Sequence, residues 1–474
     1  AKGNCSILDY RCHFSNDWLE HFKTPVNMDL KNKIVSVIGL GKTGVATANF
    51  LARRGAKVSI MDNKPYDLLS ELTDQLLLGI ETVYQNCEPL PDSDLVVVSP
   101  SVDIESDFLK NSRQKGTEVI SEIELASRVN SASLIGITGT NGKSTCTSLI
   151  DEILTEGGKN TQAGGNLGTP FISLVDQGPT EYRVLEISSF QMEATYSFHP
   201  KIAVILNITP DHLDRHESFM QYVGLKEKVY ANQTKNDSLI LNYDDSNTRS
   251  LGGNCPAKQI FFSLENELEC GVYVNKGKIF ARINEFEGEV FALSSLSRGL
   301  RWQIENVLPA VAAALLLKIS LESIKKVLGS FVGLEHRLEW VCSQDGVDFI
   351  NDSKGTNVGS AYKSLNTFDR PIILIAGGKD KNADFSSLKK IMKKKVKHLI
   401  LIGETRPKFR SLLNGSFRYE ESDSLEDAVH KAKEKADKGD VVLLSPACAS
   451  FDMFADYIDR GNQFKSIVKN LERC

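Results

Sequence analysis

The stretch Gly139-Thr140-Asn141-Gly142-Lys143-Ser144-Thr145 decides how the chain folds around its centre. The apolar run from Leu134 to Ile137 precedes it and predicts a buried strand, and apolar residues recur at helical spacing from Ser144 to Leu154. A glycine-rich loop between a strand and a helix offers an anion its backbone N–H groups and the positive end of the helix. The lysine could reach the outer phosphates of a nucleotide, and a hydroxyl residue after it could bind Mg²⁺. We therefore predict a nucleotide-binding site here.

Size and composition limit the class of protein. A chain of 474 residues predicts two to four domains. The net charge of -5 and a pI near 6.0 give no reason to expect nucleic acid or an anionic membrane as partner. No apolar run approaches the ~20 residues of a membrane span, and the polar start does not resemble a signal peptide. The nine scattered cysteines predict reduced thiols in a cytoplasmic protein.

The first regular pattern begins after residue 30, so residues 1–30 are interpreted as an extension whose role cannot be deduced. Ile34 to Ile38 predicts a strand, Gly39 to Gly44 forms a G-x-G-x-x-G turn, and Val45 to Arg54 predicts a helix. Lys57 to Met61 predicts a second strand that ends at Asp62. An acidic residue about 20 positions beyond the glycines is typical of dinucleotide binding. Taken alone, the pattern favours an NAD-dependent oxidoreductase and another nucleotide use equally.

A further apolar run continues the α/β alternation. Asp94 to Val98 predicts a strand, and Ser99-Pro100 follows it directly. In open parallel sheets ligands bind off the carboxyl ends of the strands, so we expect Asp62 and Ser99 at a ligand. We predict that this first domain spans residues 31–121.

Polar groups follow the predicted strands of a central domain, residues 122–333. Ala163 to Gly168 is interpreted as a tight loop in which Asn166 can face a ligand. Tyr182 to Ile187 places Glu186 at a strand end, where nucleotide hydrolases carry a metal-binding acid. Ala203 to Asn207 predicts the next strand.

Three histidines and one lysine of this domain are considered as candidates for the site. A single histidine is more often structural than a ligand, but the Asp, His and Arg residues gathered after a buried strand favour a ligand role for His212. His199 and His216 are interpreted as structural. Lys226 lies on a predicted helix, Phe219 to Gln233, and composition alone does not distinguish it from solvated helical lysines.

Residues 235–300 predict a small β-rich excursion, and Asn306 opens an Ala-rich helix. A last domain, residues 334–474, alternates helical segments with strands predicted at Val347–Ile350, Pro371–Ala376, His398–Ile402 and Asp440–Leu444. Each of these strands ends in a polar or glycine-rich loop, which points to a second substrate. The fold class is therefore α/β in three domains: a Rossmann-like sheet, a central domain of the phosphate-loop mononucleotide-binding type, and a C-terminal Rossmann-like domain.

Together these stretches resemble the Mur ligase family. The residues that carry the resemblance are Gly139–Thr145, Glu186–Gln191, Asp211–Arg215, His336-Arg337, Asn351–Asn357 and Ser445–Phe451. The resemblance runs from about residue 31 to the C-terminus. The phosphate loop and the Asp-His-x-Asp motif are shared with folate-type polyglutamyl synthetases, whereas residues 352–357 and 445–450 are similar to the D-glutamate-adding members.

The resemblance implies an ATP-dependent amide ligase of peptidoglycan precursor synthesis. Such an enzyme adds D-glutamate to UDP-N-acetylmuramoyl-L-alanine through an acyl phosphate, and a monomer in the cytoplasm is expected. Another Mur-type or polyglutamyl amino-acid ligase remains the alternative. The first domain would then hold UDP in place of a dinucleotide.

The family's functional residues fall on matching positions of this sequence. For the UDP-sugar these are Lys42, Thr43, Asp62, Asn63, Ser99, Pro100, Asn166 and His212. ATP, expected between the central and last domains, would use Gly139 to Thr145 together with Asn306, Arg337 and Asp352. One Mg²⁺ would be held by Ser144 and Glu186, and a second by His212 and a Lys226 carbamylated by CO₂. D-Glutamate would be held by Lys354, Thr356, Lys381, Ser450 and Tyr457, and the catalytic set is Lys143, Glu186, His212 and Lys226.

Some positions depart from the family pattern, and two rival functions stay open. Ile137 stands where the general phosphate loop begins with Gly, Trp302-Gln303 where the family has His-Asn, Ser101 where a Gly follows Ser-Pro, and Tyr457 where Phe is frequent. An oxidoreductase would have no use for Lys143 or the strand-end acids. A non-enzymatic, nucleotide-dependent binding module would hydrolyse ATP without depending on an amino acid.

Overall fold

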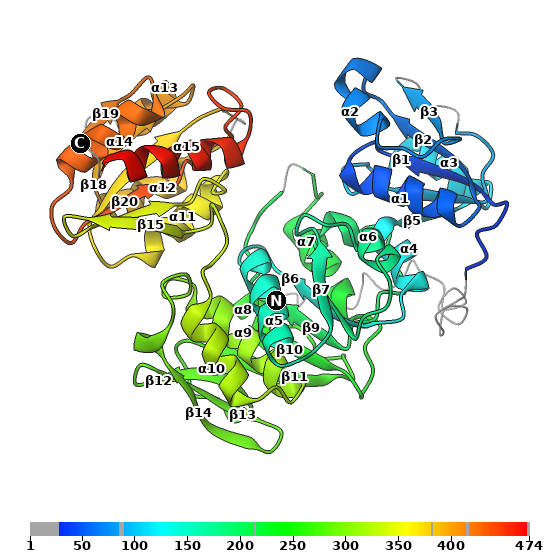
Figure 1. Cartoon of the computed structure of the whole chain (residues 1–474), viewed down its shortest axis with the longest axis horizontal. Helices are drawn as coiled ribbons and strands as arrows, with labels where there is room; N and C mark the ends of the chain where they lie inside the picture. The colour runs from blue at the N-terminus through cyan, green and yellow to red at the C-terminus, as the bar shows by residue number, and fades with distance from the viewer. Residues whose placement is uncertain (1–27, 85–89, 213–214, 381–382, 414–416, 472–474) are drawn as a thin grey trace, which may run out of the picture. The chain divides into compact units, whose positions relative to one another are not determined.

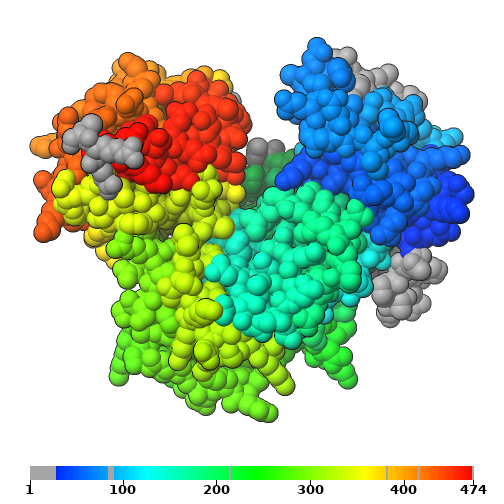
Figure 2. Space-filling view, in the orientation of Figure 1, coloured from blue at the N-terminus to red at the C-terminus, as the bar shows by residue number. Residues whose placement is uncertain are grey.

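A computed structural model of the chain describes residues 28–84, 90–212, 215–380, 383–413 and 417–471 (Figure 1). The chain separates into two units, Ala1–Phe262 with Ala312–Lys318, and Ser263–Val311 with Ile319–Cys474. Three α/β regions follow one another along the chain, as expected, and the space-filling view shows the first in blue and the last in yellow to red (Figure 2). The proposed domain boundaries at residues 121 and 333 stay predictions.

The first sheet is parallel throughout, in the order β3-β2-β1-β4-β5. Its strands are β1 (Ile34–Ile38), β2 (Lys57–Asp62), β3 (Glu81–Tyr84), β4 (Leu95–Val98) and β5 (Glu118–Ser121). Its helical segments are α1 (Lys42–Arg53), η3 (Tyr66–Leu68), α2 (Ser70–Thr73) and α3 (Asp107–Gln114). The strand order reverses at β1, whose two neighbours are β2 and β4. A ligand crevice is therefore expected at the carboxyl ends of β1, β2 and β4.

The central parallel strands run β11-β10-β9-β6-β8-β7. They are β6 (Ser133–Thr138), β7 (Thr161–Gly165), β8 (Tyr182–Glu186), β9 (Ile202–Ile205), β10 (Ser238–Asn242) and β11 (Lys258–Ser263). The helices are α4 (Glu122–Val129), α5 (Lys143–Glu156), α6 (Phe171–Asp176), α7 (Phe219–Glu227) and α8 (Ser246–Arg249), with short 3₁₀ turns η4 (Phe190–Met192) and η5 (Lys228–Tyr230).

Three sequence predictions in this region were wrong in their limits. Residues 163–165 end strand β7, because they pair with β8, so the predicted loop starts at Asn166. The helix predicted to reach Gln233 ends as α7 and the turn η5. β10 and β11 pair in parallel with the main strands, so the β-rich excursion begins only at β12.

The second unit contains an antiparallel meander and a third sheet. The meander is β12 (Gly271–Asn275), β13 (Lys278–Ile283) and β14 (Phe286–Ala292), followed by η6 (Leu293–Ser295). Helices α9 (Ile304–Leu316) and α10 (Leu321–Ser330) lead to the third sheet, ordered β15-β16-β20-β17-β18-β19. Its strands are β15 (Glu339–Gln344), β16 (Val347–Asn351), β17 (Ile372–Gly377), β18 (Val396–Ile402), β19 (Tyr419–Glu421) and β20 (Val441–Leu444). Its helices are α11 (Val358–Thr367), α12 (Ser386–Lys395), α13 (Arg406–Leu413), α14 (Leu425–Lys435) and α15 (Tyr457–Asn470).

The third sheet is covered on both faces. Along β17, Leu374 and Ala376 belong to one apolar cluster and Ile373 and Ile375 to another, because successive side chains of a strand point to opposite faces. Helices α11, α12 and α13 cover the first face, and α14 and α15 the second. Such two-sided burial explains why parallel strands are apolar at nearly every position. Among the described residues, no helix is long and apolar enough to cross a membrane.

Candidate active site

The loop between β6 and α5 is shaped to receive an anion. Gly139 and Gly142 have φ angles of 145° and 88°, a region that side chains other than glycine's rarely allow. Within the described structure, helix α5 has no side-chain N-cap and no acidic residue in its first turn, so no carboxylate there competes for its N-terminal N–H groups. Lys143 Nζ donates to the carbonyls of Gly139 and Thr140, 2.9 Å away in each case. The lysine therefore lies folded back over its own loop.

Residues after β9 are hydrogen-bonded to this loop. Asn207 Oδ1 accepts from the N–H of Asn141 at 2.9 Å, and its Nδ2 donates to the Asn141 carbonyl at 3.0 Å. The Thr140 hydroxyl lies 3.1 Å from the Tyr222 hydroxyl and donates to the Thr209 carbonyl. These hydrogen bonds thus fix the position of the loop.

The predicted metal ligands meet at the end of β8. The Ser144 hydroxyl donates to Glu186 Oε2 at 2.5 Å, and Asn166 Nδ2 donates to Glu186 Oε1 at 2.6 Å. Glu186 and Ser144 are both buried. Mg²⁺ prefers oxygen ligands and keeps several waters or substrate phosphate oxygens, so one hydroxyl and one carboxylate beside a phosphate loop suit it. No cluster of three or more His, Cys, Asp or Glu suited to a metal occurs in the described part of the chain.

Lys226 lies beside the same loop, although its sequence context did not distinguish it. Its side chain is 2% exposed, Nζ donates to the Gly139 carbonyl at 2.9 Å, and the ammonium lies 4.4 Å from the centre of the Tyr222 ring. Burial, and then the nearby charge of Lys143, hold the pKa of Lys226 well below its usual range. A lysine with a lowered pKa can present a neutral, nucleophilic amine.

His212 lies at the edge of this group. Its φ of 54° places it in a left-handed turn, its backbone N–H donates to Asp211, and its ring meets Phe190 edge-on at 5.0 Å. The role of His212 as a ligand stays a prediction. His216 is buried, lies 3.0 Å from the Ser189 hydroxyl and stacks on Phe190, which fits a structural residue.

The glycine turn of the first domain is braced by two predicted site residues. Asp62 accepts from the backbone N–H of Leu40 and of Lys64, each at 2.9 Å. The Ser99 hydroxyl donates to the Gly39 carbonyl at 3.0 Å. Lys42 and Thr43 open α1, whose N-terminus has no side-chain cap among the described residues, and Asn63 and Pro100 follow Asp62 and Ser99. The structure therefore gathers these six predicted residues at the carboxyl edge of the first sheet.

The third domain surrounds a buried carboxylate. Asp352 accepts from the hydroxyls of Ser364 at 2.6 Å and Ser445 at 2.8 Å, and from the backbone N–H of Leu338. Burial raises the pKa of Asp352 to about 6, although these hydrogen bonds and the charge of Arg337 oppose the shift.

Asn306 of α9 is also buried, and its Oδ1 has no hydrogen-bond partner among the described residues. That oxygen can accept a hydrogen bond from a ligand.

The predicted D-glutamate residues lie on two loops that touch. Lys354 Nζ lies 5.3 Å from the centre of the Tyr457 ring, and the Ser353 hydroxyl donates to the Tyr457 carbonyl at 2.8 Å. Thr356 belongs to the first loop and the buried Ser450 to the second. Lys381 lies outside the described residues.

Comparison with known proteins identifies the group to which this arrangement belongs. Three family models match: the MurD-like N-terminal domain of Mur ligases over residues 33–121, the Mur ligase middle domain over 137–314, and the Mur ligase glutamate ligase domain over 336–448. A UDP-N-acetylmuramoylalanine–D-glutamate ligase of Koribacter versatilis is 41% identical, over 94% of this chain and 99% of its own. One of Geotalea uraniireducens is 43% identical over the same shares. The chain belongs to the Mur ligase family.

Two ligases of lower sequence identity share the fold. The structure of MurF ligase from Thermotoga maritima has a TM-score of 0.59 at 16% identity and covers 94% of this chain and 99% of its own. A pseudomurein peptide ligase type C from Methanothermus fervidus has a TM-score of 0.57 at 21% identity, over 93% and 100%.

Sequence reasoning missed several residues that organise the site of this Mur ligase. Arg460 is fully buried and donates to the backbone of Ser353, Cys448 and Ala449, so it joins the two loops of the third domain. Burial lowers the pKa of Arg460 to about 10. Asn207 could have been found, because it is the polar residue that ends the apolar run from Ala203 predicted as a strand. Arg460 lies within a helical pattern and carries no such signal.

Proposed function

We propose that this Mur ligase joins D-glutamate to UDP-N-acetylmuramoyl-L-alanine at the expense of ATP. The proposal is carried by one combination: Lys143, Ser144 and Glu186 gather at a phosphate loop, in a chain that matches 99% of the length of relatives bearing that activity in their names. The rival oxidoreductase would give these three residues no role.

The reaction requires activation because a carboxylate cannot lose oxide to an attacking amine. We propose that the L-alanyl carboxylate attacks the γ-phosphorus of ATP, which releases ADP and forms an acyl phosphate. The amine of D-glutamate then attacks the acyl carbon, loses a proton and expels inorganic phosphate. Amide bond, ADP and phosphate are the products, and the atoms balance without a further reactant.

The first step brings two anions together, so positive charge must be placed beforehand. Lys143 is held 2.9 Å from two loop carbonyls and can turn from them to the outer phosphates, while the N–H groups of α5 would face the anion. Ser144 and Glu186 would hold one Mg²⁺, which supplies charge stabilisation at the transferring phosphoryl group. A dry site strengthens each of these interactions and protects an acyl phosphate from water.

We also propose that CO₂ carbamylates the amine of Lys226 and that this carbamate and His212 hold a second Mg²⁺. The support is the burial of Lys226, its lowered pKa and its hydrogen bond to Gly139. Carbamylation would convert the cationic amine of Lys226 into an anionic group whose oxygens can bind Mg²⁺.

The remaining predicted residues are proposed as substrate contacts. The UDP-sugar would be bound by Lys42, Thr43, Asp62, Asn63, Ser99, Pro100, Asn166 and His212. The ATP nucleoside would be bound by Asn306, Arg337 and Asp352, and D-glutamate by Lys354, Thr356, Lys381, Ser450 and Tyr457. In favour of the six first-domain residues is their position around the uncapped N-terminus of α1, where a diphosphate would be stabilised.

The test is phosphate release from Mg-ATP with UDP-N-acetylmuramoyl-L-alanine, with D-glutamate, L-glutamate, L-alanine or L-lysine added in turn. We expect release that requires both the sugar nucleotide and D-glutamate. Release with another amino acid alone would keep the ligase reaction and overturn the acceptor. Phosphate release that is independent of any amino acid would favour the nucleotide-dependent binding module, and oxidation of NADH would favour the oxidoreductase.

A further inference from the structure

Arg215 joins the first domain to the catalytic region of the central domain. Its Nη2 donates to the carbonyl of Val102 at 3.1 Å and to Glu193 Oε2 at 3.1 Å, and its Nη1 lies 3.6 Å from Asp103. Val102 and Asp103 belong to the loop after β4, and Glu193 belongs to the segment after β8. One guanidinium therefore contacts both domains, and its planar fork suits two acceptors at once.

Both ends of this contact are tied to predicted site residues. On the first domain, the N–H of Val102 donates to the Ser99 carbonyl at 3.0 Å, and the Ser99 hydroxyl is bonded to the glycine turn. On the central domain, the backbone N–H of Arg215 donates to the His212 carbonyl at 3.0 Å. A shift of Arg215 would therefore move the turn that carries His212.

An aromatic path continues from Arg215 to the phosphate loop. The guanidinium lies 5.8 Å from the centre of the Phe190 ring, and Phe190 stacks on His216. His216 packs against Tyr222 at 5.4 Å, and the Tyr222 hydroxyl meets the Thr140 hydroxyl. Close-packed contacts of this kind transmit small displacements instead of absorbing them.

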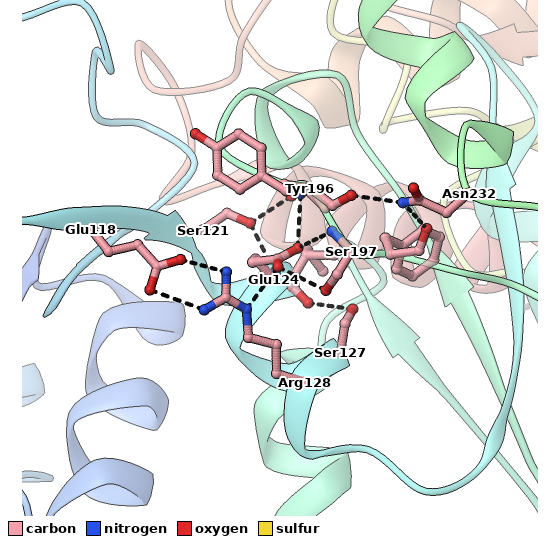
Figure 3. A network of polar contacts seen from close by, with 11 residues as sticks. Glu118, Ser121, Glu124, Ser127, Arg128, Tyr196, Ser197 and Asn232 are labelled. Carbon is pink, nitrogen blue, oxygen red and sulfur yellow. Dashed lines mark hydrogen bonds and ion pairs between the residues drawn. The ribbon is translucent and has the colours of Figure 1, made fainter. Parts of the chain in front are cut away.

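The segment that carries Glu193 is itself firmly held. Glu124 Oε2 accepts from the backbone N–H groups of Tyr196 and Ser197 at 2.8 and 2.7 Å, and Arg128 donates to Oε1, as Figure 3 shows. Lys228 Nζ donates to the carbonyls of Met192 and Glu193. The Glu193 segment of the central domain, to which Arg215 is bonded, is therefore fixed by several hydrogen bonds.

We propose that Arg215 is a positioning residue that sets where the sugar nucleotide's terminal carboxylate lies relative to the phosphate loop. This inference rests on the proposed function. Arg215 would control where the bound substrate lies and would contribute little to the affinity for UDP. Misplacement of a reacting group by about 1 Å can lower a rate by roughly two orders of magnitude.

The chain offers a matched control. Arg53 of α1 bonds to Asp176 of α6 at 2.5 Å, so it also joins the first and central domains. Among the described residues, its ion pair touches neither the loop after β4 nor the His212 turn. Loss of Arg53 would report the effect of losing an interdomain ion pair as such. Exposed ion pairs are worth ~1 kcal/mol or less, so little change in stability is expected.

The experiment compares Arg215→Gln, Arg215→Lys and Arg53→Gln with the unaltered chain. Steady-state phosphate release gives kcat and the KM for each substrate, calorimetry without ATP gives the Kd for the sugar nucleotide, and melting gives Tm. For Arg215→Gln we expect kcat to fall about tenfold to a hundredfold, with the sugar-nucleotide Kd changed by about threefold or less. Arg215→Lys, which keeps the charge but loses the fork, should recover part of the rate, and Arg53→Gln should match the unaltered chain.

Three outcomes overturn the inference. The first is a kcat for Arg215→Gln equal to that of Arg53→Gln, and the second is a loss of sugar-nucleotide affinity that accounts for the whole loss of activity. The third is a loss of activity in both Arg215 variants that follows only a lowered Tm. If the unaltered chain gives no D-glutamate-dependent phosphate release, both the proposed function and this inference are wrong. If the unaltered chain is active and one of the three outcomes occurs, only the inference about Arg215 is wrong.

Discussion

Ser144 Oγ lies 2.5 Å from Glu186 Oε2, so a hydrogen bond joins the first turn of α5 to the end of β8. The second oxygen of Glu186 accepts from Asn166. The carboxylate is therefore oriented in advance, and a bound Mg²⁺ would need little reorganisation of the protein. Preorganisation of this kind is the main source of electrostatic catalysis.

Glu186→Gln should separate this role from folding. Glutamine keeps an acceptor for Asn166 and a polar partner for Ser144, so Tm should change little, but its amide lacks the charge that holds the metal. We expect kcat for phosphate release to fall about a hundredfold or more, with a higher Mg²⁺ concentration needed for half-maximal rate. Asp151→Asn is the control, because Asp151 lies on α5, the helix that carries Ser144, and accepts from the Thr161 hydroxyl of β7 at 2.8 Å. An active Glu186→Gln variant would remove Glu186 from the metal site.

The buried amine of Lys226 predicts a dependence on CO₂. Only the neutral amine reacts with CO₂, and burial together with Lys143 favours that form by lowering the pKa. Phosphate release should fall in CO₂-depleted buffer and recover on addition of bicarbonate, and the dependence should steepen as the pH falls and the amine becomes protonated. Lys226→Met should be nearly inactive with or without bicarbonate.

Lys228 supplies the control for this experiment. It is half-buried and has a pKa lowered to about 8, chiefly by burial. Its ammonium donates to the carbonyls of Met192 and Glu193, whereas that of Lys226 donates to Gly139 of the phosphate loop. Lys228→Arg should keep the response to bicarbonate of the unaltered chain. Equal activity of the unaltered chain in depleted and supplemented buffer would exclude the carbamate.

Sequence reasoning succeeded where a local pattern carried the information. Strands β1, β6 and β17 were predicted from their apolar runs, and the loops after them from their glycines. Both signals lie in residues that are adjacent in the sequence. β3 and β19 were not predicted, because each is a short edge strand without an apolar run. The end of β7 was taken for a loop because its Ala-Gly-Gly has turn composition. In the structure Gly165 is required by close packing, because a Cβ there would lie 2.4 Å from the Glu186 carbonyl oxygen.

Contacts between distant residues could not be deduced in the same way. The helix that carries Lys226 looks solvated in sequence, and only the packing of α7 against the phosphate loop reveals a buried amine. Arg215 likewise gains its partners Val102 and Glu193 from two other loops. Residue type and spacing identified the candidate ligands, whereas the residues that position them depend on tertiary structure.

The glycine turn of the first domain allows a paired substitution. A Cβ on Gly44 would lie 1.9 Å from the Gly39 carbonyl oxygen, whereas a Cβ on Gly41 would meet nothing within 4 Å. Gly44→Ala should therefore force α1 away from β1 and destabilise the domain by roughly 1–3 kcal/mol. Gly41→Ala should leave stability nearly unchanged and weaken binding of the sugar nucleotide, because its methyl group would stand at the uncapped N-terminus of α1. Urea unfolding and calorimetry measure the two effects, and equal stability of both variants would contradict the packing argument.

Asp352 predicts a pH dependence of stability that its own amide variant should lack. Its pKa is about 6 in the folded chain, against an ordinary value of 3.8, because burial disfavours the charged form. Between these two values the folded state binds more protons than the unfolded state, so this residue lowers the free energy of unfolding as the pH rises from about 4 to about 6. Above that range the loss is complete and amounts to ~3 kcal/mol, since each pKa unit corresponds to about 1.4 kcal/mol. In the Asp352→Asn variant the amide does not titrate and can still bond to the hydroxyls of Ser364 and Ser445.

The measurement is urea unfolding of Asp352→Asn and the unaltered chain at about pH 4 and about pH 7. The stability of the variant relative to the unaltered chain should increase by up to ~3 kcal/mol between these conditions. Asp348 provides a control whose pKa shift has the opposite sign. It lies on β16, the strand that ends directly before Asp352. Burial raises its pKa, but hydrogen bonds from Arg370 and Trp340 outweigh this and leave the pKa lowered. The shift of Asp348 acts below its ordinary value of 3.8, so the relative stability of Asp348→Asn should change little between these two conditions. Parallel pH profiles for the two variants would contradict the assignment of a raised pKa to Asp352.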